Sequence, residues 1–213
     1  MKGSSHFVIG VVAGAAVGLQ ANYSLLTTAI CAGIGGVSGL VPDLDTNGVA
    51  SNRITVSKQI SKTLMQIVGV CILFAIAYKA ATDGFALNDC IYGGLSLTLL
   101  ILSKKITQRR MLTLTGAMVI LLGISWQQSI GIILSGSYIV IASFLPHRSY
   151  THSIIGLAFY AFILVKLNEQ WPVNGMVAAG IAGYISHLLA DMKLLPMNRR
   201  GVKWFAPVWN REF

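Results

Sequence analysis

Apolar runs, separated by short charged or turn-rich stretches, follow one another along almost the whole 213-residue sequence. Only 11% of the residues are charged, less than half of the fraction of about 25% that is usual in a soluble domain. Several runs are about 16 residues long, slightly short of the roughly 20 residues that a full membrane span requires. We expect helices at 6–20, 24–41, 63–79, 88–103, 110–126, 129–145, 152–167 and 173–190. The sequence therefore predicts an all-α, polytopic integral membrane bundle of about eight transmembrane helices, formed by residues 1–213 as a single membrane domain.

The distribution of basic residues predicts the topology of this bundle. With eight crossings, fourteen of the sixteen lysines and arginines lie on the side that holds both termini, and only Lys79 and Lys166 lie on the other. Short cytoplasmic loops carry such an excess, so both termini are expected in the cytoplasm. The net charge of +9 is then mainly a topology signal, which favours anionic lipid head groups as partners and no nucleic acid.

Histidines and aspartates gather on the same predicted side. All four histidines and three of the aspartates fall at helix ends there: His6, Asp43, Asp45, His147, His152, His187 and Asp191. Ionisable groups at such positions in a membrane protein are costly unless they are paired or functional. His187 and Asp191 are four residues apart and so share one face of a helix, a spacing that suits either a shared metal ion or a simple hydrogen bond at the helix end. Glycines spaced by four, Gly14–Gly18 and Gly35–Gly39, would allow the first two helices to pack closely.

Four segments together resemble the YdjM-like family, described as LexA-regulated, membrane-bound, metal-dependent hydrolases of bacteria. They are His6, residues 40–45 (LVPDLD), residues 147–153 (HRSYTHS) and residues 183–192 (GYISHLLADM). The family motifs lie in residues 1–58 and 140–213, and 59–139 resemble inserted helices without motifs. The resemblance implies a multi-pass protein of the bacterial inner membrane under control of the SOS response. It also suggests a distant similarity to the helical zinc phospholipase C and nuclease fold, which hydrolyses phosphoesters with a metal cluster.

The donor types define the expected chemistry. Imidazoles and carboxylates without thiolates suit a divalent metal, with zinc expected and manganese or iron as alternatives. The seven residues above exceed the ligand set of one catalytic zinc and would suffice for two ions that activate water. Asp43 is expected to be a ligand, while Asp45 would either bind a second ion or orient His6 or His152. Arg148, between the two histidines of its motif, is a candidate to pair with a phosphate oxygen.

These features predict a metal-dependent hydrolase, in particular a phosphoesterase, acting on a lipid or lipid-linked phosphate at the cytoplasmic interface. Residues 193–213 combine basic and aromatic side chains, a pattern typical of a segment lying on anionic lipid, or of a lid over the site. Two other classes remain open at this point. One is a metal transporter or metal sensor that uses the same ligands, and the other is a structural membrane protein whose polar cluster orders its helices.

Overall fold

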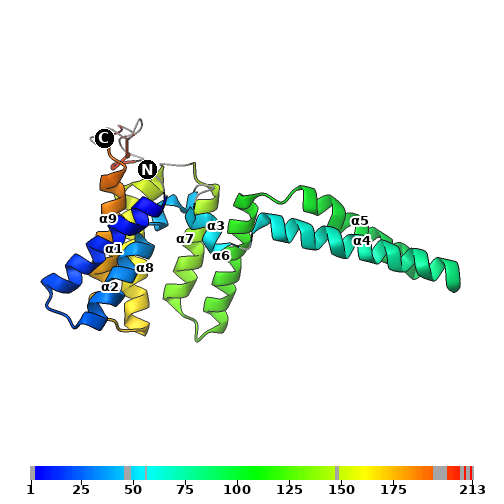
Figure 1. Cartoon of the computed structure of the whole chain (residues 1–213), viewed down its shortest axis with the longest axis horizontal. Helices are drawn as coiled ribbons and strands as arrows, with labels where there is room; N and C mark the ends of the chain where they lie inside the picture. Colours follow the sequence, from blue (N-terminus) through cyan, green and yellow to red (C-terminus); the bar gives the residue numbers. More distant parts are fainter. Residues whose placement is uncertain are drawn as a thin grey trace. The chain divides into compact units, whose positions relative to one another are not determined.

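A computed structural model describes residues 3–45, 49–55, 57–146, 149–193, 201–206, 209 and 212, and this part of the chain is helical without a β-strand (Figure 1). The elements in chain order are α1 (Gly3–Gln20), α2 (Leu25–Ser38), the 3₁₀ helix η1 (Val41–Asp45), α3 (Val49–Ile54), α4 (Lys58–Thr82), α5 (Leu87–Lys104), α6 (Gln108–Ser125), α7 (Ile130–Phe144), the 3₁₀ helix η2 (Tyr150–His152), α8 (Ile154–Gln170) and α9 (Met176–Ala190). Each of the eight predicted helices is present, which confirms the all-α class. The short elements α3, η1 and η2 were not predicted.

Eight transmembrane helices are not confirmed. Among the described residues, three stretches are long and apolar enough to cross a membrane: Gly3–Gln20, Leu25–Asp45 and Lys58–Thr82. The pair α5 and α6, which a short break separates, would raise the number to four if it forms one broken span. Helices α7 and α9 are apolar but have only 15 residues each, or about 22 Å of helix against a hydrocarbon core of about 30 Å. Their length is the reason why these two apolar helices are not among the candidate spans.

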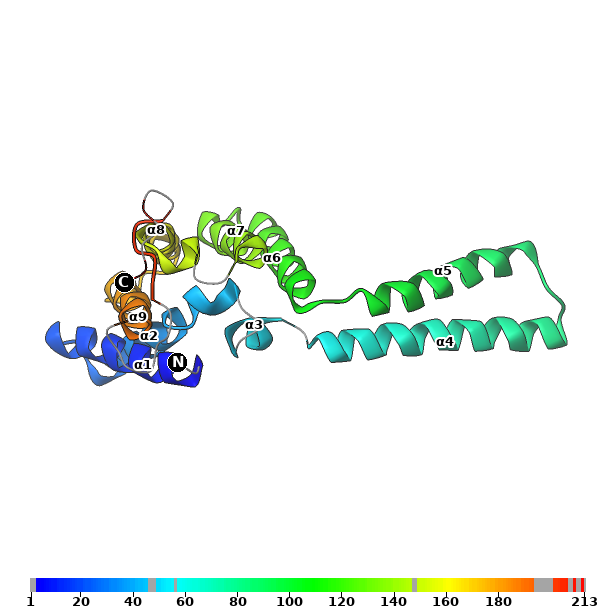
Figure 2. The ribbon, with the colours of Figure 1, turned by 90° about the horizontal axis from the view of Figure 1, so that it is seen from above.

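The chain divides into two compact units, Met1–Ile54 with Leu112–Phe213, and Thr55–Met111. In the second unit α4 and α5 form a helical hairpin, seen in Figure 2, in which Ser96 donates a hydrogen bond to the carbonyl of Gly69. Lys79 pairs with the buried Asp89 at 2.8 Å near the turn of this hairpin. The unit overlaps the first part of the predicted insertion at 59–139, whose remainder belongs to the first unit. The single-domain assignment stays a prediction.

In the first unit, α1, α2 and α9 pack against one another, and α8 lies between α9 and α7. The buried faces of α1, α2 and α9 carry small residues spaced by four, each row ending in a candidate ligand. The rows are His6–Gly10–Gly14–Gly18 on α1, Cys31–Gly35–Gly39–Asp43 along α2 into η1, and Gly175–Ala179–Gly183–His187–Asp191 along α9. Because residues four apart lie on one face of an α-helix, the rows on α1 and α9 direct His6, His187 and Asp191 toward the contact between the helices, while Asp43 follows its row after the change from α2 to η1.

Glycine is required at this contact, which we call the glycine seam. A Cβ atom at Gly35 would lie 2.4 Å from the carbonyl oxygen of Gly10, and one at Gly183 would lie 2.1 Å from that of Gly35. Helix backbones therefore touch directly, as the predicted close packing of the first two helices requires. The seam brings the start of α1 and the ends of α2 and α9 together at one end of the unit (Figure 1).

The seam predicts unequal effects for two substitutions on the same helix. Gly35→Ala should destabilise the protein by about 1–3 kcal/mol, because backbone atoms cannot yield to the added methyl group. Gly33→Ala is the matched control, since nothing lies within 4 Å of a Cβ atom there. Thermal unfolding of the detergent-solubilised variants measures the difference. Equal melting temperatures for the two variants would show that the close contact does not matter.

Candidate metal centre

Four side chains from three elements converge at the end of the glycine seam. Asp43 lies in η1, His152 ends η2, and His187 and Asp191 lie at the end of α9, one turn apart. One ligand atom from each lies within 4.8 Å of all the others, so the group could hold a metal ion. The structure therefore brings these four residues together from distant parts of the sequence, as predicted.

The separations of the ligand atoms suit a single small cation. The Nε2 atoms of His152 and His187 are 3.3 Å apart, and each lies 3.7 Å from Oδ1 of Asp43. Oδ2 of Asp191 lies 3.7–3.8 Å from the same two nitrogens. Zinc–ligand bonds of about 2.0–2.2 Å at tetrahedral angles require ligand separations of about 3.3–3.6 Å. The group therefore needs only a small contraction to surround an ion of this size.

Charge also favours a divalent cation. His152 and His187 are fully buried and Asp191 is almost so, whereas the side chain of Asp43 is 16% exposed. The two carboxylates place negative charge in a largely buried group, which is costly without compensation. A divalent ion would balance that charge, and the donor set of nitrogen and carboxylate oxygen suits zinc, manganese or iron.

Each of the two histidines in the group is oriented by a hydrogen bond at its other ring nitrogen. Nδ1 of His187 donates to the carbonyl oxygen of Gly39 at 2.7 Å, a contact that depends on the close packing of α9 on α2. Nδ1 of His152 lies 3.0 Å from the hydroxyl of Thr151, which donates to Asp45 at 2.7 Å. In this arrangement both Nε2 lone pairs face the group, as metal-bound imidazoles require.

The remaining predicted ligands take different places. Nε2 of His6 lies 3.3 Å from Oδ1 of Asp191, and its ring stacks on His187 with centroids 3.9 Å apart. The other oxygen of Asp191 faces His152 and His187. This carboxylate could therefore bridge two metal positions, one at the four-residue group and one beside His6. Asp45 lies outside the four-residue group, on the Nδ1 side of His152 at 3.7 Å. His147 and Arg148 lie outside the described residues.

Two orienting groups are not among the residues predicted from the sequence. Thr151 directly precedes His152, and a hydroxyl next to a candidate ligand is a signal that could have identified it. The carbonyl of Gly39 carries no signal of its own, because every residue has a carbonyl group. In addition, Tyr184 donates to the carbonyl of Thr151 and is hydrogen-bonded to Tyr138. Hydrogen bonds from α9 therefore help to fix the position of η2.

The C-terminal segment packs close to this centre in its described part. Val202 is fully buried against Tyr184 and Leu188 of α9, and the backbone N–H of Ile154 donates to the carbonyl of Trp204 at 2.9 Å. Residues 201–206 are therefore integrated into the first unit. The functions expected of the tail, lipid contact or a lid, stay predictions.

The fold and the centre together define a helical membrane protein with a buried histidine and aspartate group that could hold a metal ion. Comparison with family models gives a match to the family described as YdjM inner membrane protein over residues 1–213, and the chain belongs to this family. This confirms the resemblance carried by the four sequence segments and agrees with an inner membrane protein. Comparison with curated proteins and with solved structures found no match.

The geometry predicts that His187 is necessary for metal binding. His187→Ala should remove most of the bound metal while the helical content persists, because the helices are held by the glycine seam. Leu189→Ala is the matched control, since it changes an exposed side chain two residues away on α9. Metal analysis of the purified proteins with circular dichroism tests this. Equal metal content in the two variants would contradict the proposed ligand.

Thr151 is predicted to be a positioning residue. Thr151→Val keeps the shape of the side chain but removes the hydroxyl between His152 and Asp45, and should weaken metal affinity about 10–100-fold. Thr151→Ser should restore most of the affinity. Competition with a chelator measures this, beside the melting temperature of the metal-free proteins. A role in packing alone would give a lower melting temperature without a difference in affinity between the serine and valine variants.

Proposed function

We propose that this chain is a membrane-bound, metal-dependent hydrolase that cleaves a phosphoester in a lipid or lipid-linked substrate at the cytoplasmic interface. The observation that carries the proposal is the four-residue group with its orienting hydrogen bonds. A group that served only to order helices would not require the second nitrogen of each histidine to be fixed so that the first faces two carboxylates.

A divalent ion held by these residues would lower the pKa of water toward about 7 and stabilise the charge on phosphoryl oxygens. The protein's own residues then have separable roles. Asp43, His152, His187 and Asp191 would hold the first ion. His6, beside the outer oxygen of Asp191, would contribute to a second ion if two are bound. Asp45 would act through Thr151 to keep His152 in the required tautomer.

A substrate would reach the four-residue group from the side of Asp43. Its side chain is the one partly exposed member of the group, while those of His152, His187 and Asp191 are 0–3% exposed. A substrate phosphate would therefore approach past η1. Arg148, in the segment between α7 and η2, is proposed from the sequence motif alone to pair with that phosphate.

A metal transporter or sensor is the second candidate, favoured by the same ligand chemistry. Transport sites tend to lie near the membrane midplane on interrupted helices. Here the ligands come from the end of α9 and from the 3₁₀ helices η1 and η2, which supports hydrolysis at an interface rather than passage through the bilayer.

The proposed reaction predicts phosphate release that depends on metal and on Asp43. Purified protein should hydrolyse at least one member of a panel of lipid phosphates, more rapidly as the pH rises toward about 7, and a strong chelator should abolish turnover. Asp43→Asn should abolish turnover as well. Asp83→Asn is the control, because this exposed residue lies in the second unit, at the end of α4.

Two outcomes would overturn the proposal. Undiminished hydrolysis after chelation, or by Asp43→Asn, would rule out the metal-dependent reaction. Metal uptake into sealed vesicles by the wild-type protein, without hydrolysis of any lipid phosphate, would establish the transporter instead.

A further inference from the structure

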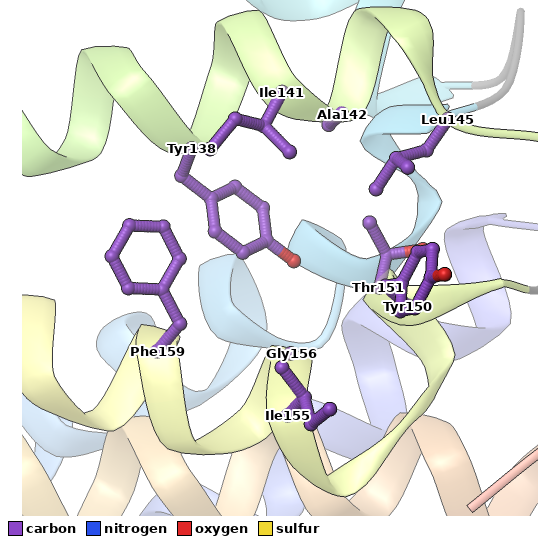
Figure 3. A pocket seen from close by; sticks show the side chains of 9 residues that line it. All are labelled: Tyr138, Ile141, Ala142, Leu145, Tyr150, Thr151, Ile155, Gly156 and Phe159. Atoms are coloured by element: carbon purple, nitrogen blue, oxygen red, sulfur yellow. The ribbon is translucent and has the colours of Figure 1, made fainter. Parts of the chain in front are cut away.

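An apolar groove runs between α7 and α8 and ends beside the candidate metal centre. It has a cavity volume of about 250 Å³, and its walls are almost entirely carbon (Figure 3). Ile141 and Leu145 line it from the α7 side, and Ile155 and Phe159 from α8. In Figure 3 the groove extends from the rings of Tyr138 and Phe159 at one end to Leu145 and Thr151 at the other.

The groove offers almost nothing to a polar ligand. Two of the hydroxyl-bearing residues in its wall are already engaged: Tyr138 is hydrogen-bonded to Tyr184, and Thr151 donates to Asp45. Tyr150, the third, is itself 40% exposed and lies at the same end of the groove as Thr151 (Figure 3). A polar head group placed in the groove would lose its hydration without gaining partners. An occupant must therefore be apolar where it lies in the groove.

The surroundings indicate which apolar occupant is available. Helices α7 and α8 also expose large apolar side chains that do not line the groove, including Phe144, Ile154 and Phe162. In a protein of a membrane family, lipid chains cover faces of this kind. The volume lies below the range of about 300–1,000 Å³ typical of drug-sized ligand pockets, and so suits part of one chain rather than a bulky ring system.

We propose that the groove between α7 and α8 holds one hydrocarbon chain of the membrane lipid that is the substrate, with the polar end of that lipid outside the groove, beyond its Thr151 end, at the metal centre. That the lipid is a substrate rests on the proposed function, but the binding site for its hydrocarbon chain depends on the groove alone. Thr151 lines the groove and precedes His152, so the wall that holds the chain also positions a ligand. The groove would thereby select substrates with a long apolar chain and set the distance from chain to phosphate.

Photochemical labelling tests whether a hydrocarbon chain binds in the groove, without relying on turnover. The protein is placed in vesicles of phosphatidylethanolamine and phosphatidylglycerol with a trace of phosphatidic acid that carries a diazirine on one acyl chain. Labelled peptides are then mapped by mass spectrometry. Labelling at Ile141, Leu145, Ile155 and Phe159 should exceed that at Phe162 and Val165 several-fold, because the last two are exposed on α8 but do not line the groove.

A filling substitution provides the matched comparison. Ile155→Trp should reduce groove labelling several-fold, whereas Val165→Trp should leave it unchanged; the two side chains are 52% and 40% exposed on the same helix. Ile141→Trp, from the opposite wall, should repeat the effect if Ile155→Trp does not fold. Metal content should stay equal in all three variants.

The other outcomes of the labelling experiment would each be decisive. Uniform labelling along α8, or full groove labelling in both groove variants, would overturn the proposal. If the wild-type protein is a dimer and Ile155→Trp is a monomer with unchanged labelling, the groove would belong to the contact with a second copy of this protein, which would overturn the proposal too. If the groove is labelled but no lipid phosphate is hydrolysed, the proposed hydrolase activity alone would be refuted. The binding site for a hydrocarbon chain would remain established.

Discussion

Direct contact between helix backbones along the glycine seam is the constraint on which the rest of the first unit depends. In a membrane, burying apolar side chains gives little drive for helices to associate, because lipid is equally apolar. Close packing and short polar contacts must hold them together instead. The carbonyl of Gly39 reaches Nδ1 of His187 only because α9 lies against α2 at Gly183 and Gly35. The contact that holds the helices thus also orients a candidate metal ligand.

The charges at the end of the seam follow from the same arrangement. Small residues at every fourth position remove the bulk that would otherwise separate the helix ends, and the ligands continue those rows. His6 stacks on His187 and contacts Asp191 for this reason. Metal–ligand distances in a site that fits its ion agree with standard values to within about 0.2 Å. Rigid backbone contact supplies such precision better than long, flexible side chains would.

Much of the architecture could be predicted from the sequence, because apolar periodicity and antiparallel order are local signals. These signals locate the eight main helices and place His152, His187 and Asp191 at one end, where the structure has them. The number of membrane spans could not be obtained in this way, since it depends on helix ends that polar turns and the 3₁₀ helices define. The partner of Nδ1 of His187 was also out of reach, because a backbone carbonyl leaves no mark in the sequence, whereas the hydroxyl of Thr151 beside His152 could have been recognised. The functional roles of His147 and Arg148 stay predictions of the motif.

The 3₁₀ geometry of η1 explains why Asp43 and Asp45 differ although they are two residues apart. With three residues per turn, side chains at these positions point about 120° apart around the helix axis. Asp43 approaches Nε2 of His152, while Asp45 lies on the side of Nδ1 and accepts the hydrogen bond of Thr151. In an α-helix, with 3.6 residues per turn, the same two positions would point about 160° apart, on nearly opposite faces. The tighter turn therefore allows two carboxylates of one short segment to flank a single imidazole. The inner carboxylate can then fix the ring, while the outer one, which is partly exposed, belongs to the group that could hold a metal ion.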